Sequence, residues 1–307
     1  MKTPAQRGAA LIVAMVIAAL AAAVAMSLAA NQQQWFASMA NRRDQVQAQA
    51  LALAGIQWAR QILFEDARTT QIDSLIEPWS FPLPATPLEG GSIEGQIVDA
   101  QGLLNVNSLA STSASVNVPA ERARFERLFA RLGIPVATLD AIADWIDADN
   151  TARANGAEDA YYAQQTAPML AANAPIVRNA ELSLVRGMSP AMVTALAPYV
   201  TALPTTAPLN VNTAPAPVLA AALDGVDGSA ISALIASRAQ QPFSSIGNFR
   251  SRLPQGAALS NEAGFDVKSR YFIVTVLARQ GETRARARAL LERGSGRWPS
   301  IVWQTVE

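Results

Sequence analysis

An acidic loop near the middle of the chain holds the residues best suited to binding a metal ion. Asp147, Asp149, Glu158 and Asp159 bring four carboxylates into one short stretch, with the amide of Asn150 among them. Like charges so close together repel one another unless a cation lies between them. Calcium, a hard cation that takes six to eight oxygen ligands, suits such a loop. The alternative is a solvated acidic loop whose side chains cap turns, and the loop taken alone slightly favours that alternative.

The spacing of these carboxylates matches an EF-hand loop only in part. Counted from Asp147, acidic residues stand at positions one, three and twelve, as in an EF-hand. Position six is Ala152, where an EF-hand needs glycine for its sharp turn. We therefore do not expect an EF-hand fold here.

The overall composition leaves little room for catalysis. The chain has no Cys and no His, which removes thiolate chemistry, His-based triads and the usual catalytic zinc ligands. An enzyme of this composition would have to work with carboxylates alone, and we do not expect this chain to be an enzyme. Lys plus Arg equals Asp plus Glu, at 24 each, so the net charge gives no general reason to bind nucleic acid.

The chain begins with a segment that is long enough to span a bilayer. From Ala9 to Ala30 every residue is apolar or small except Ser27. Lys2 and Arg7 precede this segment, and positive charges before a membrane helix favour a cytoplasmic N-terminus, with the rest of the chain outside the cytoplasm. One alternative is a secretory signal peptide that is cut off near the end of the segment.

The residues just before the apolar segment distinguish these alternatives. A short polar leader ends in Arg7-Gly8, and it resembles the class III leader of type IV pilins and type II secretion pseudopilins. The resemblance implies that a prepilin peptidase cuts between Gly8 and Ala9, and that the new amine of Ala9 is methylated. It also implies that the helix stays in the inner membrane.

One position departs from the pilin pattern. The fifth mature residue of pilin-like subunits is usually Glu, which neutralises the N-terminal ammonium of the subunit assembled ahead of it. Here that residue is Val13. A subunit at the tip of a filament has no ammonium ahead of it, so Val13 suits a tip position. An ordinary residue facing lipid explains Val13 equally well.

Periodicity along the rest of the chain predicts an α+β fold. Apolar residues at helical steps extend the first helix, so we expect a leader at 1–8 and a transmembrane and stalk helix at 9–66. Residues 67–91 are rich in Pro and Gly and predict an irregular connection. Alternation at 92–99 and 283–292 and a β-branched and aromatic run at 270–278 predict strands, and 301–306 could add a last strand. The long helix should pack on one small antiparallel sheet formed by residues 67–102 and 265–307.

A large all-α domain, residues 103–264, is expected to be inserted between these strands. Its helices should lie at 120–132, 136–146, 180–185, 190–200, 215–223 and 229–239. On the expected strand 283–292, Arg284, Arg286 and Arg288 alternate with alanines and so share one face. Such a row more often faces solvent, although it could meet an acidic partner.

Several motifs in and around the insert resemble one family. Residues 99–109 (DAQGLLNVNSL) are echoed by 209–214 (LNVNTA), and 143–150 (ADWIDADN) is followed by 155–162 (NGAEDAYY). Together with 181–188 (ELSLVRGM) and the leader, these motifs are similar, in order, to the K-type minor pseudopilins of type II secretion systems.

The family resemblance implies a role, a location and partners. It implies a non-catalytic subunit at the tip of the pseudopilus that helps to initiate assembly and protein export across the outer membrane. Its partners would be the I-type and J-type minor pseudopilins, the major pseudopilin and the prepilin peptidase. The chain would cross the inner membrane once, in contact with its lipid, and place its C-terminal domain in the periplasm.

The same resemblance implies bound calcium in the acidic loop. We assign Asp147, Asp149, Glu158 and Asp159 as its ligands, which raises the calcium interpretation above the solvated loop. Asp144, Asn150 and Glu181 are weaker candidates.

A rival interpretation comes from residues 209–253, which resemble the helix-hairpin-helix of competence DNA receptors. Such hairpins hold phosphate on backbone amides and usually add nearby Lys or Arg. Here Asp224 and Asp227 flank the hairpin, while Arg238, Arg250 and Arg252 lie further on. We therefore expect a packing unit that does not bind nucleic acid.

Overall fold

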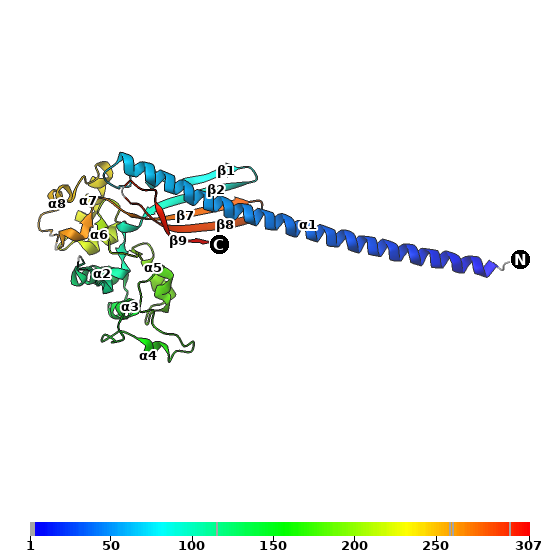
Figure 1. The fold of residues 1–307 in the computed structure, drawn as a ribbon, viewed down its shortest axis with the longest axis horizontal. Helices are drawn as coiled ribbons and strands as arrows, with labels where there is room; N and C mark the ends of the chain where they lie inside the picture. The colour runs from blue at the N-terminus through cyan, green and yellow to red at the C-terminus, as the bar shows by residue number, and fades with distance from the viewer. Residues whose placement is uncertain (1–3, 115, 258, 260, 295) are drawn as a thin grey trace.

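A single long helix gives the molecule its shape. The computed structural model describes residues 4–114, 116–257, 259, 261–294 and 296–307, with side chains from Ala9 onward, so the first three residues of the expected leader lie outside it. Helix α1 runs from Pro4 to Thr69. Its first half projects away from the rest of the chain (Figure 1), and every side chain from Ala9 to Arg43 is exposed. Among the described residues it is the one helix long and apolar enough to cross a membrane.

The second half of α1 packs on one face of a sheet. Ala48, Ala52, Ile56 and the residues that continue this stripe are buried against the sheet's apolar side chains. Small residues let the two elements approach closely. A Cβ on Gly55 would lie 2.7 Å from a side-chain carbon of Val276, so glycine is needed there.

The sheet is antiparallel and comes from both ends of the sequence. Its strands are β1 (Leu83–Leu88), β2 (Gly91–Asp99), β7 (Tyr271–Gln280), β8 (Thr283–Glu292) and β9 (Ser300–Val306), arranged in the order β1-β2-β7-β8-β9. The predicted α+β fold is confirmed. The expectation of a wholly irregular connection before β2 is wrong, because β1 forms there. Pro84 and Pro87 cannot donate backbone hydrogen bonds, and β1 tolerates them because it is an edge strand.

Residues between β2 and β7 form an insert that is helical apart from two short ladders. Its α-helices are α2 (Val118–Leu132), α3 (Thr138–Ile146), α4 (Asp159–Tyr162), α5 (Pro190–Leu196), α6 (Ala216–Ala222), α7 (Gly228–Gln240) and α8 (Ile246–Ser251). Short 3-10 helices occur in the insert at Ala100–Gly102, Val106–Ala110, Asn179–Leu184 and Glu262–Gly264, and another, Pro78–Ser80, precedes β1. The parallel ladders join β3 (Leu104–Asn105) to β4 (Val200–Thr201) and β5 (Leu209–Asn210) to β6 (Phe265–Asp266).

The repeated Leu-Asn-Val-Asn motif has the same structural role in both ladders. The second Asn of each copy forms two hydrogen bonds with the backbone of one distant residue: Asn107 with Ile176 and Asn212 with Phe243. Each motif therefore fastens a remote loop to the core of the insert.

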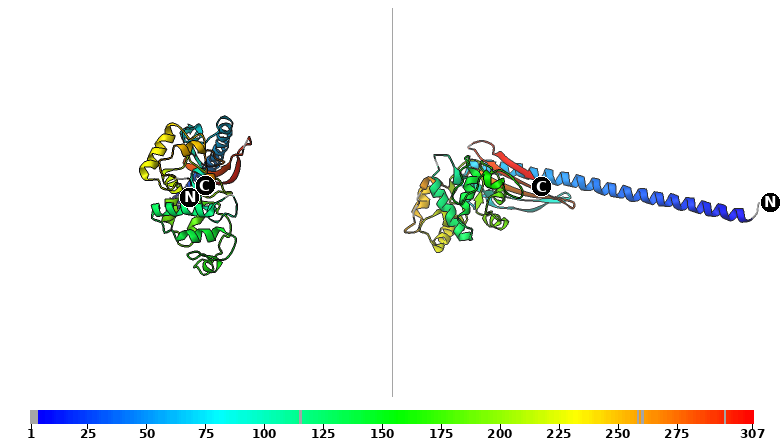
Figure 2. Two further views of the ribbon diagram at one scale, coloured as in Figure 1. Left: turned by 90° about the vertical axis from the view of Figure 1, so that its left-hand side faces the viewer. Right: turned by 90° about the horizontal axis from the view of Figure 1, so that it is seen from below.

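The insert lies at the end of the molecule opposite the N-terminus of α1. The left view in Figure 2, which looks along the length of the molecule, shows the insert spreading well to the side of the helix. The molecule is thus a slender rod that carries a broad helical head.

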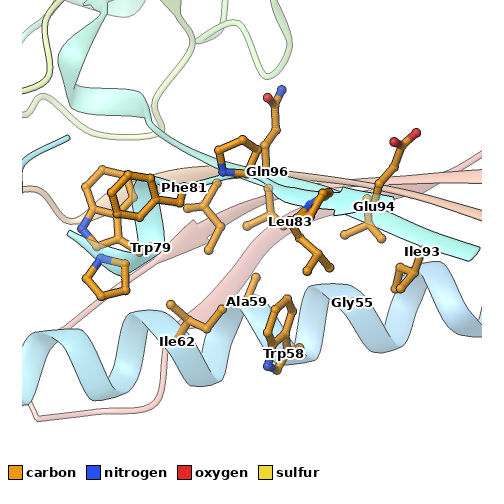
Figure 3. Close-up of a pocket in the computed structure, with 17 residues that line it drawn as sticks. Gly55, Trp58, Ala59, Ile62, Trp79, Phe81, Leu83, Ile93, Glu94 and Gln96 are labelled. Carbon is orange, nitrogen blue, oxygen red and sulfur yellow. The ribbon is translucent and has the colours of Figure 1, made fainter. Parts of the chain in front are cut away.

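An apolar groove runs between the rod and the sheet. It has a volume of about 320 Å³ and is lined from α1, from the segment 78–84 and from β2 (Figure 3). Trp58 and Phe81 border it and are 51% and 63% exposed. The groove leaves aromatic surface uncovered next to the stalk.

Candidate functional site

The acidic loop follows α3 directly and brings three of its carboxylates together. Asp147 ends the helix, and one oxygen from each of Asp147, Asp149 and Glu158 lies within 4.8 Å of the others. Spacing of this kind suits three oxygen ligands around one cation.

Buried oxygens in this group lack hydrogen-bond partners. Glu158 is only 4% exposed, and neither of its carboxylate oxygens accepts a hydrogen bond from a described residue; the same holds for Oδ1 of Asp147. Burial first, and then the charges of Asp144, Asp147 and Asp149, raise the pKa of Glu158 to about 7. Such oxygens are costly to bury alone, and a bound cation would satisfy them.

The other sequence-predicted ligands are engaged in hydrogen bonds around this group. Asp144 is fully buried and accepts from the backbone amide of Arg153 at 3.1 Å. The side chain of Asn150 accepts from the amide of Asp159, and Asp159 accepts from the amide of Ala171 at 2.9 Å. These residues shape the loop around the three converging carboxylates.

Glu181 has a different position in the network. Its carboxylate accepts the backbone amides of Val177 and Arg178 and so caps the 3-10 helix that begins at Asn179. It is outside the group of three converging carboxylates.

Sequence reasoning missed the basic residue of this loop. The guanidinium of Arg153 lies 2.5 Å from both Asp144 and Asp147 and bridges the last turn of α3. The available signal was a lone arginine inside an acidic stretch. Arg153 neutralises part of the crowded charge and leaves Asp149, Glu158 and one oxygen of Asp147 for a cation.

The loop closes through a close backbone contact at Gly156. A Cβ there would overlap Oδ2 of Asp144 and lie 3.1 Å from the amide of Arg153. We expect Gly156→Ala to destabilise the protein by about 1–3 kcal/mol and to lower its Tm by several degrees. Gly228→Ala is the control, because a Cβ at Gly228 meets no atom within 4 Å. Equal melting temperatures for the two variants would contradict the packing described for Gly156.

A second acidic group lies where the stalk meets the sheet. Carboxylate oxygens of Asp66, Asp73 and Glu77 also converge there, and all three residues are buried. The guanidinium of Arg293 occupies this group, 2.7 Å from Asp66 and 2.5 Å from Asp73. Burial is the main cause that raises the pKa of Asp66 to about 6. An internal cation is therefore already present, and the group serves to join α1 to the end of β8.

The arginines in and after the hairpin between α6 and α7 contact other residues of the chain. Arg238 is buried and donates to the carbonyl of Val211 at 2.7 Å, and burial lowers its pKa to about 10. Arg252 stacks on Phe243, and Arg250 pairs with Glu262 at 2.9 Å. These contacts agree with a packing unit and leave little positive charge for a phosphate backbone.

Comparison with known proteins identifies the family of this chain. Residues 102–205 and 209–268 match the two family models described as type II secretion system protein K. The chain is 33% identical to type II secretion system protein K of Pseudomonas aeruginosa, over 94% of this chain and 89% of that protein. The chain belongs to the protein K family of type II secretion systems. The protein K of Klebsiella pneumoniae is 32% identical over 97% of this chain and 95% of its own length.

A solved structure agrees with the family at the level of the fold. A chain in the crystal structure of the GspK-GspI-GspJ complex of the enterotoxigenic Escherichia coli type 2 secretion system superposes with a TM-score of 0.74. It is 24% identical and covers 87% of this chain and 98% of its own length. The relatives and the fold agree with the predicted protein K family and give no support to the DNA-receptor alternative.

Proposed function

We propose that this member of the protein K family is a minor pseudopilin at the tip of the type II secretion pseudopilus. There it helps to initiate pseudopilus assembly and protein export across the outer membrane, and it is not an enzyme. The observation that carries this proposal is an uncovered apolar helix, Ala9–Ala30, with a broad head at its opposite end. The apolar helix suits a membrane anchor, and the broad head suits the end of a filament.

The tip position is supported by shape and by one residue. The helical insert extends to the side of the stalk, so a column of identical subunits would have to make room for it at every step. Val13 cannot neutralise the ammonium of a subunit ahead of it. Both features are acceptable in a subunit that occurs once, at the end.

Processing and orientation follow from the N-terminus. A prepilin peptidase would cut after Gly8 and leave a methylated amine on Ala9, with the helix retained in the inner membrane. Lys2 and Arg7 favour a cytoplasmic leader, and the sheet and the insert would then lie in the periplasm.

The apolar groove beside α1 supports a protein partner. Trp58 stands twenty-eight residues after Ala30, or about 42 Å along the helix, so membrane lipid does not reach it. Because the solved relative is part of a GspK-GspI-GspJ complex, we propose the I-type and J-type minor pseudopilins as partners here, with the major pseudopilin below them.

Co-purification tests this assignment. Expressed with its I-type and J-type counterparts, the chain should elute as a three-protein complex. The double variant Trp58→Glu with Phe81→Glu should weaken that complex at least about tenfold, because the two new carboxylates would lie against an apolar surface of the partner. Leu170→Glu is the control, since Leu170 is 64% exposed and does not line the groove. Failure of the wild-type chain to co-elute with either partner would overturn the proposal.

We also propose calcium as the ion of the acidic loop. Asp147, Asp149 and Glu158 would ligate it directly, and Asp159, Asn150 and Asp144 would hold the loop in shape. A cation there would join the end of α3 to the start of α4, so its contribution would be to the stability of the head.

A further inference from the structure

The sheet has a second face that α1 does not cover. Along β7 and β8, alternate residues point toward α1 and are buried, while the intervening residues point away from it. The second set includes Arg279, Arg284, Arg286 and Arg288, all exposed, which we call the arginine face. The strand alternation thus gathers four guanidinium groups on the side of the sheet opposite the stalk.

The arginine face is crowded with positive charge. Arg279 and Arg284 are direct cross-strand partners, an arrangement that like charges disfavour. Within the part of the chain that the structure describes, none of the four forms an ion pair. The side-chain carboxylates of Glu94 and Glu307 line the same hollow as three of these arginines, so two acidic side chains accompany the four guanidinium groups.

At its inner end the arginine face borders a hollow of about 210 Å³ between the sheet and the insert. Arg286 and Arg288 enter it from β8, and Arg178 lines it from the insert. Its floor is apolar where Ile273 and Leu290 contribute side chains. Glu307 also lines the hollow, which therefore combines three guanidinium groups and one carboxylate with an apolar base.

One hydrogen-bond donor of this hollow has no acceptor. Trp303 lines the hollow from β9, and its buried indole Nε1 has no hydrogen-bond partner among the described residues. A buried N–H without an acceptor is uncommon, because the loss of its water is then uncompensated. Because this Nε1 is closed to solvent, an incoming group does not reach it, and the indole contributes ring surface to the hollow rather than a hydrogen bond.

We propose that the hollow and the arginine face bind an acidic, extended segment of a partner protein. Side chains two residues apart on a strand lie about 6.6–6.8 Å apart. A segment with carboxylates on alternate residues would therefore match the spacing of Arg284, Arg286 and Arg288. Its intervening side chains would point away from the sheet, because successive side chains of an extended segment lie on opposite sides. The carboxylates of Glu94 and Glu307 would repel the evenly spaced phosphates of a nucleic acid. A protein segment, whose carboxylates can be spaced to avoid these two residues, is therefore the better match.

A peptide-binding experiment on the full-length chain in neutral detergent tests this proposal. The probe is a fluorescent peptide of four Glu-Val repeats, and the readout is fluorescence anisotropy at low salt. We expect saturable binding that weakens as salt is added. Arg286→Glu with Arg288→Glu should weaken it at least about tenfold. Arg42→Glu with Arg131→Glu is the control, because these two exposed arginines lie outside the hollow.

The controls separate this proposal from nonspecific attraction. Melting temperatures of all variants show whether each one is folded. Equal binding by a Lys-Val peptide, unchanged binding by the double charge-reversal variant, or no binding by the wild-type chain overturns the proposal. Tighter binding of an oligothymidylate, lost in the same double variant, overturns it in favour of phosphate recognition. The experiment contains no other pseudopilin, so its result is independent of the proposed tip function.

Discussion

Calcium should raise the Tm of the detergent-solubilised chain, and Asp149→Ala should remove most of that rise. An ion that binds only the folded state stabilises it by about 2.7 kcal/mol at a hundred times its Kd. For a cooperative folding unit of about 150–250 residues that corresponds to roughly 5–10 °C. The measurement is tryptophan fluorescence during heating, in millimolar calcium and in chelator.

The Asp149 variant distinguishes a ligand from a capping residue. Asp149 also accepts the amide of Thr151 at 2.8 Å, so its loss should lower the Tm slightly in chelator and strongly in calcium. Glu262→Gln is the control, since it removes a surface ion pair with Arg250 far from the loop in sequence. Equal losses for Asp149→Ala in calcium and in chelator would refute direct ligation.

The pH dependence of this effect should follow Glu158. Its pKa is about 7 in the folded chain without calcium, and the carboxyl must lose its proton before it can ligate the ion. Calcium affinity should therefore fall as the pH is lowered from 8 to 6. In chelator the pH dependence of stability has the opposite sign. The carboxyl of Glu158 binds its proton more tightly in the folded state than in the unfolded state, so the free energy of unfolding rises as the pH falls from 7 toward 4.5, the ordinary pKa of a glutamate. Glu158→Gln should abolish both trends.

Replacing Gly8 with valine should leave the leader attached and reduce secretion to near background. The uncut chain would keep Lys2 and Arg7 at the start of its helix. Burying those charges among the apolar helices of a filament costs several kcal/mol, which should exclude the chain from assembly. Intact mass gives the processing state, and export of a secreted reporter gives the function.

The matched control for Gly8→Val is Ala5→Val, which adds a similar side chain within the leader but away from the expected cut. This control should be processed and should support secretion. Normal cleavage of the Gly8 variant, or removal of the whole apolar segment from both variants, would contradict the proposed processing.

Much of the fold was predictable because its signals are local. The long helix and four strands of the sheet follow from the periodicity of neighbouring residues, and the structure places them within a few residues of the predicted ranges. β1 was missed because Pro84 and Pro87 are typical of loops, and they are acceptable only at a sheet edge. The position of an edge depends on strand pairing, which short sequence patterns do not specify.

The candidate site was predictable in composition but not in geometry. The sequence shows that carboxylates gather after α3, yet which three converge depends on the bridge made by Arg153 and the close approach at Gly156. The buried contacts of Arg293 with Asp66 and Asp73 join residues more than two hundred positions apart. No local pattern predicts such a pairing.

The N-terminus of the wild-type chain, extracted from membranes, tests the central claim most directly. Intact mass and N-terminal sequencing should show a chain that begins at methylated Ala9 and keeps its apolar helix. A freely soluble chain that begins near Asn31 would show that the helix is only an export signal, and no membrane-anchored filament subunit could then be inferred.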